Sequence, residues 1–182
     1  VMLWETVWPN LLAPALFTSV LAFRQPFVKA CGSPKRACYV FGALQVVCTI
    51  GRFLSFQSLM DPKNEFLEFV SPALLIFFAY LLAGFGFLLN AMVYYRLGIC
   101  GVYYGSAFGV DMPWCTQWPF GENGIPHPQY VGVTLQTFGS ALLHSSSLGL
   151  AFTAVTAVQY VVIIVIEDYF FKEIDRQRVR DQ

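Results

Sequence analysis

The chain has 182 residues, of which 57% are hydrophobic and only 12% are charged. In soluble domains roughly a quarter of the residues are charged. The composition of this chain therefore excludes an ordinary soluble domain and predicts a multi-span membrane protein. Lys plus Arg and Asp plus Glu both number 11, so the net charge gives no indication of a nucleic-acid partner.

The five cysteines lie in or beside apolar segments without CxxC spacing. This pattern predicts buried thiols and neither a disulfide framework nor a metal site. The first residues show no basic region and no small-residue cleavage site, so we expect no removable signal peptide. We expect residues 1–182 to form a single all-α integral membrane domain, built as a helical bundle.

Residues 1–30 contain an apolar run that prolines such as Pro9 and Pro14 interrupt. The run is short for a membrane span, and Trp4 and Trp8 are typical of the aromatic belt at a membrane interface. We expect an interfacial or half-inserted intramembrane helix here. A poorly packed full span is the alternative.

Residues 37–59 form the first clear span, after a short basic turn at residues 32–36. The span contains Arg52, an ionisable group that costs a few kcal/mol at mid-membrane. Two roles remain open for this arginine. It snorkels to an interface or pairs within the bundle, or it holds a lipid phosphate.

Residues 71–97 form the second clear span and follow a polar connector at residues 61–68. Gly84, Phe85 and Gly86 lie in the middle of this span. A GxG pattern inside an apolar helix is by itself more typical of close helix packing than of a ligand site.

Residues 98–129 lack a spanning run and are rich in glycine and aromatic residues. Segments of this length are usually functional or disordered, and the many aromatic residues argue against disorder. We expect a lid or site loop at the membrane interface. The stretch from Ile125 to Tyr130, where this segment ends and the next apolar segment begins, contains prolines that favour the first turn of a helix.

Residues 130–166 are apolar but interrupted near His144, which leaves a single span or a hairpin of two short helices. Basic residues concentrate in the first connection, residues 24–36, and in the charged amphipathic tail, residues 167–182. The positive-inside rule puts both on the cytoplasmic side. Because two clear spans separate them, only a hairpin returns the tail to that side, and we favour the hairpin.

A hairpin would place His127 and Tyr130, at its start, and Glu167 and Asp168, at its end, on one face of the membrane. A single span would put the two pairs on opposite faces. The hairpin therefore predicts a site at its open end. His144 would lie at the far turn, where a structural capping role is the better interpretation.

A series of short motifs occurs in a specific order and spacing between Gly32 and Gln177. Through these motifs the chain resembles the phosphatidylethanolamine N-methyltransferase family of small membrane enzymes. The motifs are Gly32-Ser-Pro, Arg52, Gly84-x-Gly86, Leu97-Gly98-x-x-Gly101, Pro119-Phe120, Pro128-x-Tyr130-x-Gly132, His144-x-Ser146 and Glu167-Asp168.

The resemblance implies an enzyme that transfers a methyl group from S-adenosylmethionine to phosphatidylethanolamine and to its mono- and dimethyl derivatives, leading to phosphatidylcholine. It implies a multi-pass protein of the endoplasmic reticulum membrane, or of a mitochondrial membrane, with a cytosolic tail. It also implies that the phospholipid substrate reaches the site from the bilayer. The preferred methylation step and the oligomeric state stay open.

The resemblance assigns the binding of S-adenosylmethionine to Gly84, Phe85 and Gly86 and to the acidic pair Glu167 and Asp168. The animal enzyme has Glu-Glu at the acidic pair, so Asp168 is one methylene shorter. No metal is implied.

The amine that receives the methyl group must be unprotonated, so the expected catalytic residues are Glu167, His127 and Tyr130. Glu167, Glu122 or His127 could act as a base, and imidazole titrates near neutrality. The animal enzyme has Asn in place of His127. Aromatic rings can hold a sulfonium or a methylammonium, and Tyr103, Tyr104, Trp118 and Tyr130 are available for that.

Two alternatives come from the same residues. One is a related membrane methyltransferase that acts on a prenylcysteine carboxylate. The other is a non-catalytic scaffold or a small-solute transporter. A transporter predicts polar residues that face each other at mid-membrane, where the spans offer little beyond Arg52, Gln45 and Asn90.

Overall fold

The computed structural model describes residues 2–60, 70–112 and 115–180, without the side chains of residues 2–7, 9 and 172–180. The expected connector at residues 61–68 and the basic side chains of the tail lie outside the described residues. Within these ranges every regular element is a helix. This confirms the all-α fold class.

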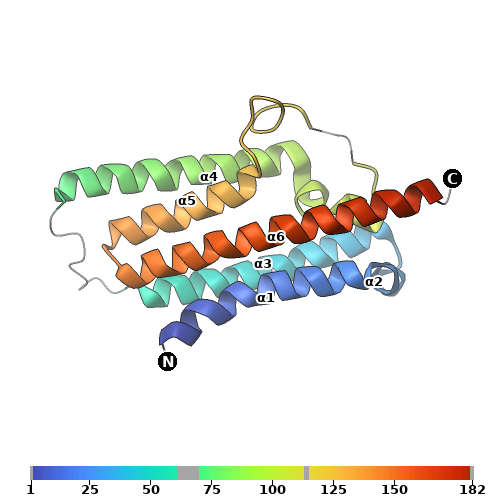
Figure 1. Cartoon of the computed structure of the whole chain (residues 1–182), viewed down its shortest axis with the longest axis horizontal. Coiled ribbons are helices and arrows are strands. Elements are labelled where there is room, and N and C mark those ends of the chain that lie inside the picture. Colours follow the sequence, from blue (N-terminus) through green and yellow to red (C-terminus); the bar gives the residue numbers. More distant parts are fainter. Residues whose placement is uncertain (1, 61–69, 113–114, 181–182) are drawn as a thin grey trace.

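The long helices run lengthwise beside one another in an elongated bundle, and α2 (Arg24–Cys31) turns across one end of it (Figure 1). Among the described residues, three helical stretches are long and apolar enough to cross a membrane, namely Pro34–Leu59, Pro72–Phe108 and Ser147–Phe171. In chain order the helices are α1 (Met2–Ala22), α2 (Arg24–Cys31), α3 (Pro34–Leu59), α4 (Pro72–Val102), the short 3₁₀ helix η1 (Gly105–Phe108), α5 (Pro128–Leu143) and α6 (Ser147–Arg180).

The N-terminal segment forms two helices, α1 and α2, that meet at an angle of 86°. Phe17 and Leu21 of α1 are only 3% and 2% exposed, and α1 packs along α3 and α6. The segment expected at an interface is therefore partly inside the bundle. The bent pair adds a fourth span if it crosses the membrane as one broken helix.

Helix α3 begins with Ser33 and Pro34, a capping residue followed by a proline in the first turn. The Ser33 side chain accepts a hydrogen bond from the Arg36 amide at 3.3 Å. The helix buries Ala37 and Phe41 against the bundle. Its outward face exposes Val47, Ile50, Phe53 and Leu54, which is the surface expected against lipid.

Glycines allow α4 and α5 to approach closely. A Cβ atom built on Gly86 would lie 2.4 Å from the carbonyl oxygen of Gly132, and one on Gly139 would lie 2.5 Å from that of Ala79. Real Cβ atoms do not approach backbone so closely. Small residues of this kind are common where membrane helices pack.

Helix α4 does not stop at Leu97, where the sequence pattern ends the span. The backbone breaks at Gly98, with φ 62° and ψ −178°, and continues as helix to Val102. The positive φ suits glycine because a Cβ atom disfavours it. Past the break the chain turns toward η1 and α3 at the end of the bundle (Figure 1), and Tyr103 and Tyr104 follow.

Of the two alternatives for residues 130–166, the structure has the hairpin. Helix α5 is 16 residues long, about 24 Å at 1.5 Å per residue. His144 lies at the turn, with Nδ1 2.9 Å from the Ser140 carbonyl, and the Gly149 amide donates to Ser146 Oγ at 3.0 Å. The start of α5 and the C-terminal part of α6 consequently share the end of the bundle where α2 and η1 lie (Figure 1).

Candidate active site

Glu167 of α6 is the centre of a cluster at this end of the bundle. The hydroxyl groups of Tyr104 and Tyr130 both donate hydrogen bonds to Glu167 Oε1. Among the described residues, no other side chain bonds this carboxylate. Three separate segments therefore meet at one oxygen, and none of the described side chains bonds the second carboxylate oxygen.

Tyr130 continues the cluster toward the interior of the bundle. Its ring stacks on the ring of Tyr160, with centroids 4.6 Å apart and planes at 15°. The Tyr160 hydroxyl accepts a hydrogen bond from an Arg52 guanidinium nitrogen at 2.9 Å. A row of contacts thus joins Glu167, through two tyrosines, to Arg52.

Tyr104 is held in place by its backbone and by its ring. The residue has a backbone φ of 58°, a value that is uncommon for residues other than glycine, asparagine and aspartate. Its ring lies 4.8 Å from that of Phe17 and 6.0 Å from that of Phe171. Packing against α1 and α6 fixes the direction in which its hydroxyl points.

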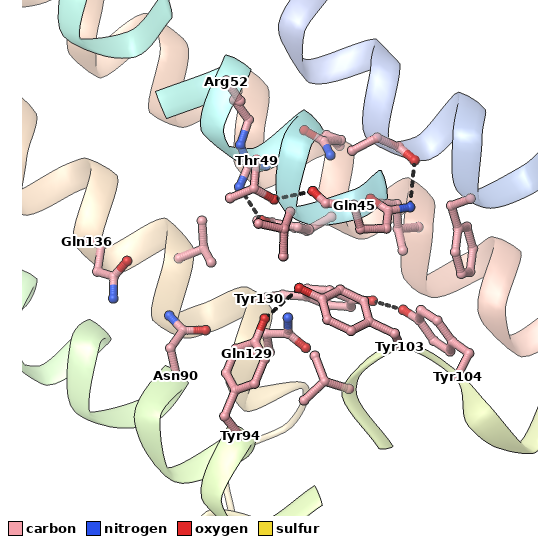
Figure 2. A pocket seen from close by; sticks show the side chains of 18 of the residues that line it. Gln45, Thr49, Arg52, Asn90, Tyr94, Tyr103, Tyr104, Gln129, Tyr130 and Gln136 are labelled. Carbon is pink, nitrogen blue, oxygen red and sulfur yellow. Dashed lines mark hydrogen bonds between the residues drawn. The ribbon is translucent and has the colours of Figure 1, made fainter. Parts of the chain in front are cut away.

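A cavity of about 300 Å³ lies beside this row, inside the bundle. Figure 2 shows Gln45, Thr49 and Arg52 of α3 on one side of it and Asn90 and Tyr94 of α4 on the other. The tyrosines that line it are Tyr94, Tyr103, Tyr104, Tyr130 and Tyr160. The carboxamides that line it are Gln45, Asn90, Gln129, Gln136 and Gln159.

The family model described as "Phospholipid methyltransferase" matches residues 74–178. The chain is 33% identical over 153 residues to phosphatidylethanolamine N-methyltransferase of Rattus norvegicus, covering 82% of this chain and 74% of the relative. It is 34% identical over 156 residues to phosphatidyl-N-methylethanolamine N-methyltransferase of Neurospora crassa, covering 83% and 70%. No solved structure matches it.

The chain belongs to the phospholipid methyltransferase family. It is accordingly a membrane methyltransferase, and the resemblance first seen in short motifs is confirmed. A transporter or scaffold is not favoured. The family also implies a methyl donor as the second substrate.

The residues assigned to the donor of this methyltransferase lie in two separate regions. Glu167 lies in the tyrosine cluster beside the cavity, although it does not line the cavity itself. Gly84, Phe85 and Gly86 do not line the cavity either, and they lie in the middle of α4. Gly86 lies at the α4–α5 contact, whereas a Cβ atom on Gly84 would meet nothing within 4 Å. Asp168 is exposed, because neighbouring residues on a helix point about 100° apart.

His127 lies at the edge of the cluster. It precedes Pro128 at the start of α5, has a φ of 47° and is exposed. Its ring stacks on that of Tyr130, with centroids 5.9 Å apart and planes at 11°. Trp118, expected among the aromatic groups of the site, lies outside the cavity.

Sequence reasoning missed the polar lining of the cavity. Gln129, Gln136 and Gln159 were not singled out. Gln45 and Asn90 were considered only as evidence for a transporter, and Arg52 was left with two open roles, one of them the binding of a lipid phosphate. The available signal was their presence in apolar helices, where a polar residue is costly and usually functional. Only the arrangement of the helices shows that they share one cavity.

Proposed function

We propose that this methyltransferase uses S-adenosylmethionine to methylate the amine of phosphatidylethanolamine and of its mono- and dimethyl derivatives, leading to phosphatidylcholine. The names of its relatives support the substrate class. The observation that carries the proposal is the carboxylate of Glu167, oriented by two phenols beside a tyrosine-lined cavity.

The cluster fits the chemistry of this reaction. S-adenosylmethionine supplies a methyl group bonded to a sulfonium sulfur. The amine nitrogen attacks the methyl carbon in line, the C–S bond breaks and the neutral thioether leaves, and the ammonium proton of the acceptor goes to a base. Tyrosine rings stabilise sulfonium and methylammonium cations. A carboxylate beside them can hold an ammonium group or accept the proton.

We assign the catalytic roles to Glu167 and Tyr130, with His127 supporting the Tyr130 ring. Tyr104 and Tyr130 occupy one oxygen of Glu167, so its other oxygen is the one that meets the substrates. In this proposal Glu167 and, more weakly, Asp168 contact S-adenosylmethionine.

Gly84, Phe85 and Gly86 contribute to donor binding in this proposal by fixing α5 against α4. The close approach of Gly86 to Gly132 supports this indirect role. The start of α5 carries Tyr130, so a shift of α5 would move a catalytic hydroxyl.

The whole chain acts in this proposal as one domain of residues 1–182. The cavity takes Ala13, Gln45 and Arg52 from outside the region that the family model matches. By the positive-inside rule, we propose that the end of the bundle with the cluster and the tail faces the cytosol. The resemblance supports the endoplasmic reticulum membrane.

The test uses the purified chain in lipid nanodiscs with S-adenosylmethionine labelled in its methyl group. Separate reactions present phosphatidylethanolamine, its monomethyl form, its dimethyl form and a prenylcysteine peptide. Label is expected in the phospholipids and is expected to fall sharply in Glu167→Gln and Tyr130→Ala. Label only in the prenylcysteine peptide, or in no acceptor, would sink the proposal.

A further inference from the structure

Arg52 is a charged group inside the bundle, and no anionic partner for it occurs in the described part of the chain. Its side chain is 8% exposed, it donates to the Tyr160 hydroxyl, and its guanidinium lies 5.5 Å from the Tyr160 ring centroid. Among the side chains that the structure describes, which exclude those of residues 2–7, 9 and 172–180, no carboxylate is bonded to or paired with it. A buried cation is costly unless an anion pairs with it.

A second polar group lines the same cavity and has no partner among the described residues. Gln159 is 8% exposed, and neither its amide nitrogen nor its carbonyl oxygen has a hydrogen-bond partner. Buried carboxamides are normally bonded, so this side chain has capacity for a ligand. The hydroxyl of Tyr160 accepts from Arg52 and can still donate its own hydrogen.

We propose that Arg52, with Tyr160 and Gln159, binds the phosphodiester of the phospholipid substrate inside the membrane. A guanidinium offers paired N–H donors that match phosphate oxygens. Tyr160 and Gln159 add one donor group each. This inference rests on the proposed function, which supplies a substrate that carries a phosphate and an amine.

The wall of the cavity favours a lipid over a water-soluble anion. Val46 and Ile50 of α3 and Tyr94 of α4 line the cavity and are also exposed on the outer surface of the bundle. The cavity therefore opens between α3 and α4, on the side that faces acyl chains. Its rim on α3 is apolar, as the path of a lipid tail requires.

The positions of the two charged groups suit the zwitterionic headgroup. Arg52 contacts Tyr160 of α6. Glu167 lies further along the same helix, about 10 Å from Tyr160 at 1.5 Å per residue. That interval leaves room for the amine and the transferring methyl group among the stacked tyrosines. The phosphate would lie at Arg52 and the amine toward Glu167.

The test compares two acceptors in nanodiscs. One is phosphatidyl-N-methylethanolamine, and the other is a diacyl lipid with the same methylamino group joined through an uncharged carbamate. The wild type is expected to prefer the phosphodiester acceptor in kcat/KM. Hydrogen bonds to a charged group contribute about 1.5–3 kcal/mol, so Arg52→Gln should lower this preference by about tenfold or more.

Arg36→Gln serves as the matched control. It removes an arginine from the same helix at an exposed position outside the cavity, and the preference should not change. Gln159→Glu and Gln159→Met form a second pair. The new carboxylate should repel the phosphate and lower the preference more than methionine does, and this pair decides the question if Arg52→Gln does not fold.

The outcomes separate the proposals. An unchanged preference in Arg52→Gln overturns the inference and leaves the proposed function intact. A weaker affinity for S-adenosylmethionine, measured by calorimetry, together with an unchanged preference assigns the arginine to the methionyl carboxylate and also overturns it. Wild-type protein that methylates neither acceptor overturns the proposed function, and this inference with it.

Discussion

The α4–α5 contact and the cavity beside it are built from different kinds of residue. At the contact, Gly86 and Gly132 bring two backbones together, and nothing larger than a hydrogen atom fits between them. At the cavity, tyrosines and carboxamides surround a space large enough for a small ligand. Gly86, the second glycine of the family motif, therefore packs two helices together, whereas the polar groups that could bind a ligand lie beside that contact.

The largest effect is expected in the cluster beside the cavity, from Glu167 of the acidic pair. Glu167→Gln keeps the size of the side chain but removes its charge and its basicity, so methyl transfer should fall about hundredfold or more, the usual contribution of acid–base catalysis. Asp168→Asn should cost only a few-fold, because Asp168 is exposed. Single-turnover transfer of labelled methyl to lipid measures both.

Equal losses in Glu167→Gln and Asp168→Asn would contradict the geometry, since only one of the two carboxylates lies in the cluster. Size-exclusion profiles of both variants in nanodiscs serve as the control for folding.

The two glycines of the GxG motif give the next largest effect, and here the contact region is tested. Gly86→Leu would force α5 away from α4 and should destabilise the fold by about 1–3 kcal/mol, as overpacking does. Gly84→Leu should leave the free energy of unfolding nearly unchanged, because no atom lies within 4 Å of its Cβ position. Thermal unfolding in detergent measures the difference.

Both glycine variants should also be titrated with S-adenosylmethionine. If both lost donor binding while both remained stable, the motif would touch the donor directly, and the packing explanation would be wrong. Gly84→Ala is the milder control at the exposed position.

The spans could be predicted from the sequence because apolar runs are a local signal. The hairpin followed from counting basic residues, which is a topological argument and needs no contacts. The continuation of α4 past Gly98 was not predicted, since its turn toward α3 depends on packing at the end of the bundle. The burial of Phe17 and Leu21 likewise depends on α3 and α6.

The site was predictable only where chain order determines it. His127, Tyr130 and Glu167 follow from the two ends of one hairpin. The partnership of Arg52 with Tyr160 does not, because it depends on how each helix is rotated about its axis. In a soluble protein the apolar face shows that rotation, but here both the lipid-facing and the inward faces are apolar.

The two phenols that orient Glu167 provide a finer test of the cavity. Tyr104→Phe and Tyr130→Phe each remove one hydrogen bond to a charged group, so each should lower kcat by about tenfold. Because both hydroxyls bond the same oxygen, the double variant should lose less than the product of the two single losses.

The control for the tyrosine pair is Tyr94→Phe, since the Tyr94 hydroxyl bonds that of Tyr103 at 2.7 Å and not the carboxylate. If the loss of kcat in the double variant equals the product of the two single losses, the two phenols act independently. That result would contradict the role of the shared carboxylate oxygen.

The smallest effect is expected from His127→Asn, at the edge of the cluster. Asparagine tolerates the positive φ of this position and loses the stacking on Tyr130. Stacked aromatic pairs contribute about 0.5–1.5 kcal/mol, so kcat should fall less than about tenfold, with the shape of its pH profile preserved. If the variant instead no longer showed the decrease of kcat at low pH, His127 would be the base. Glu167 would then only contact the methyl donor.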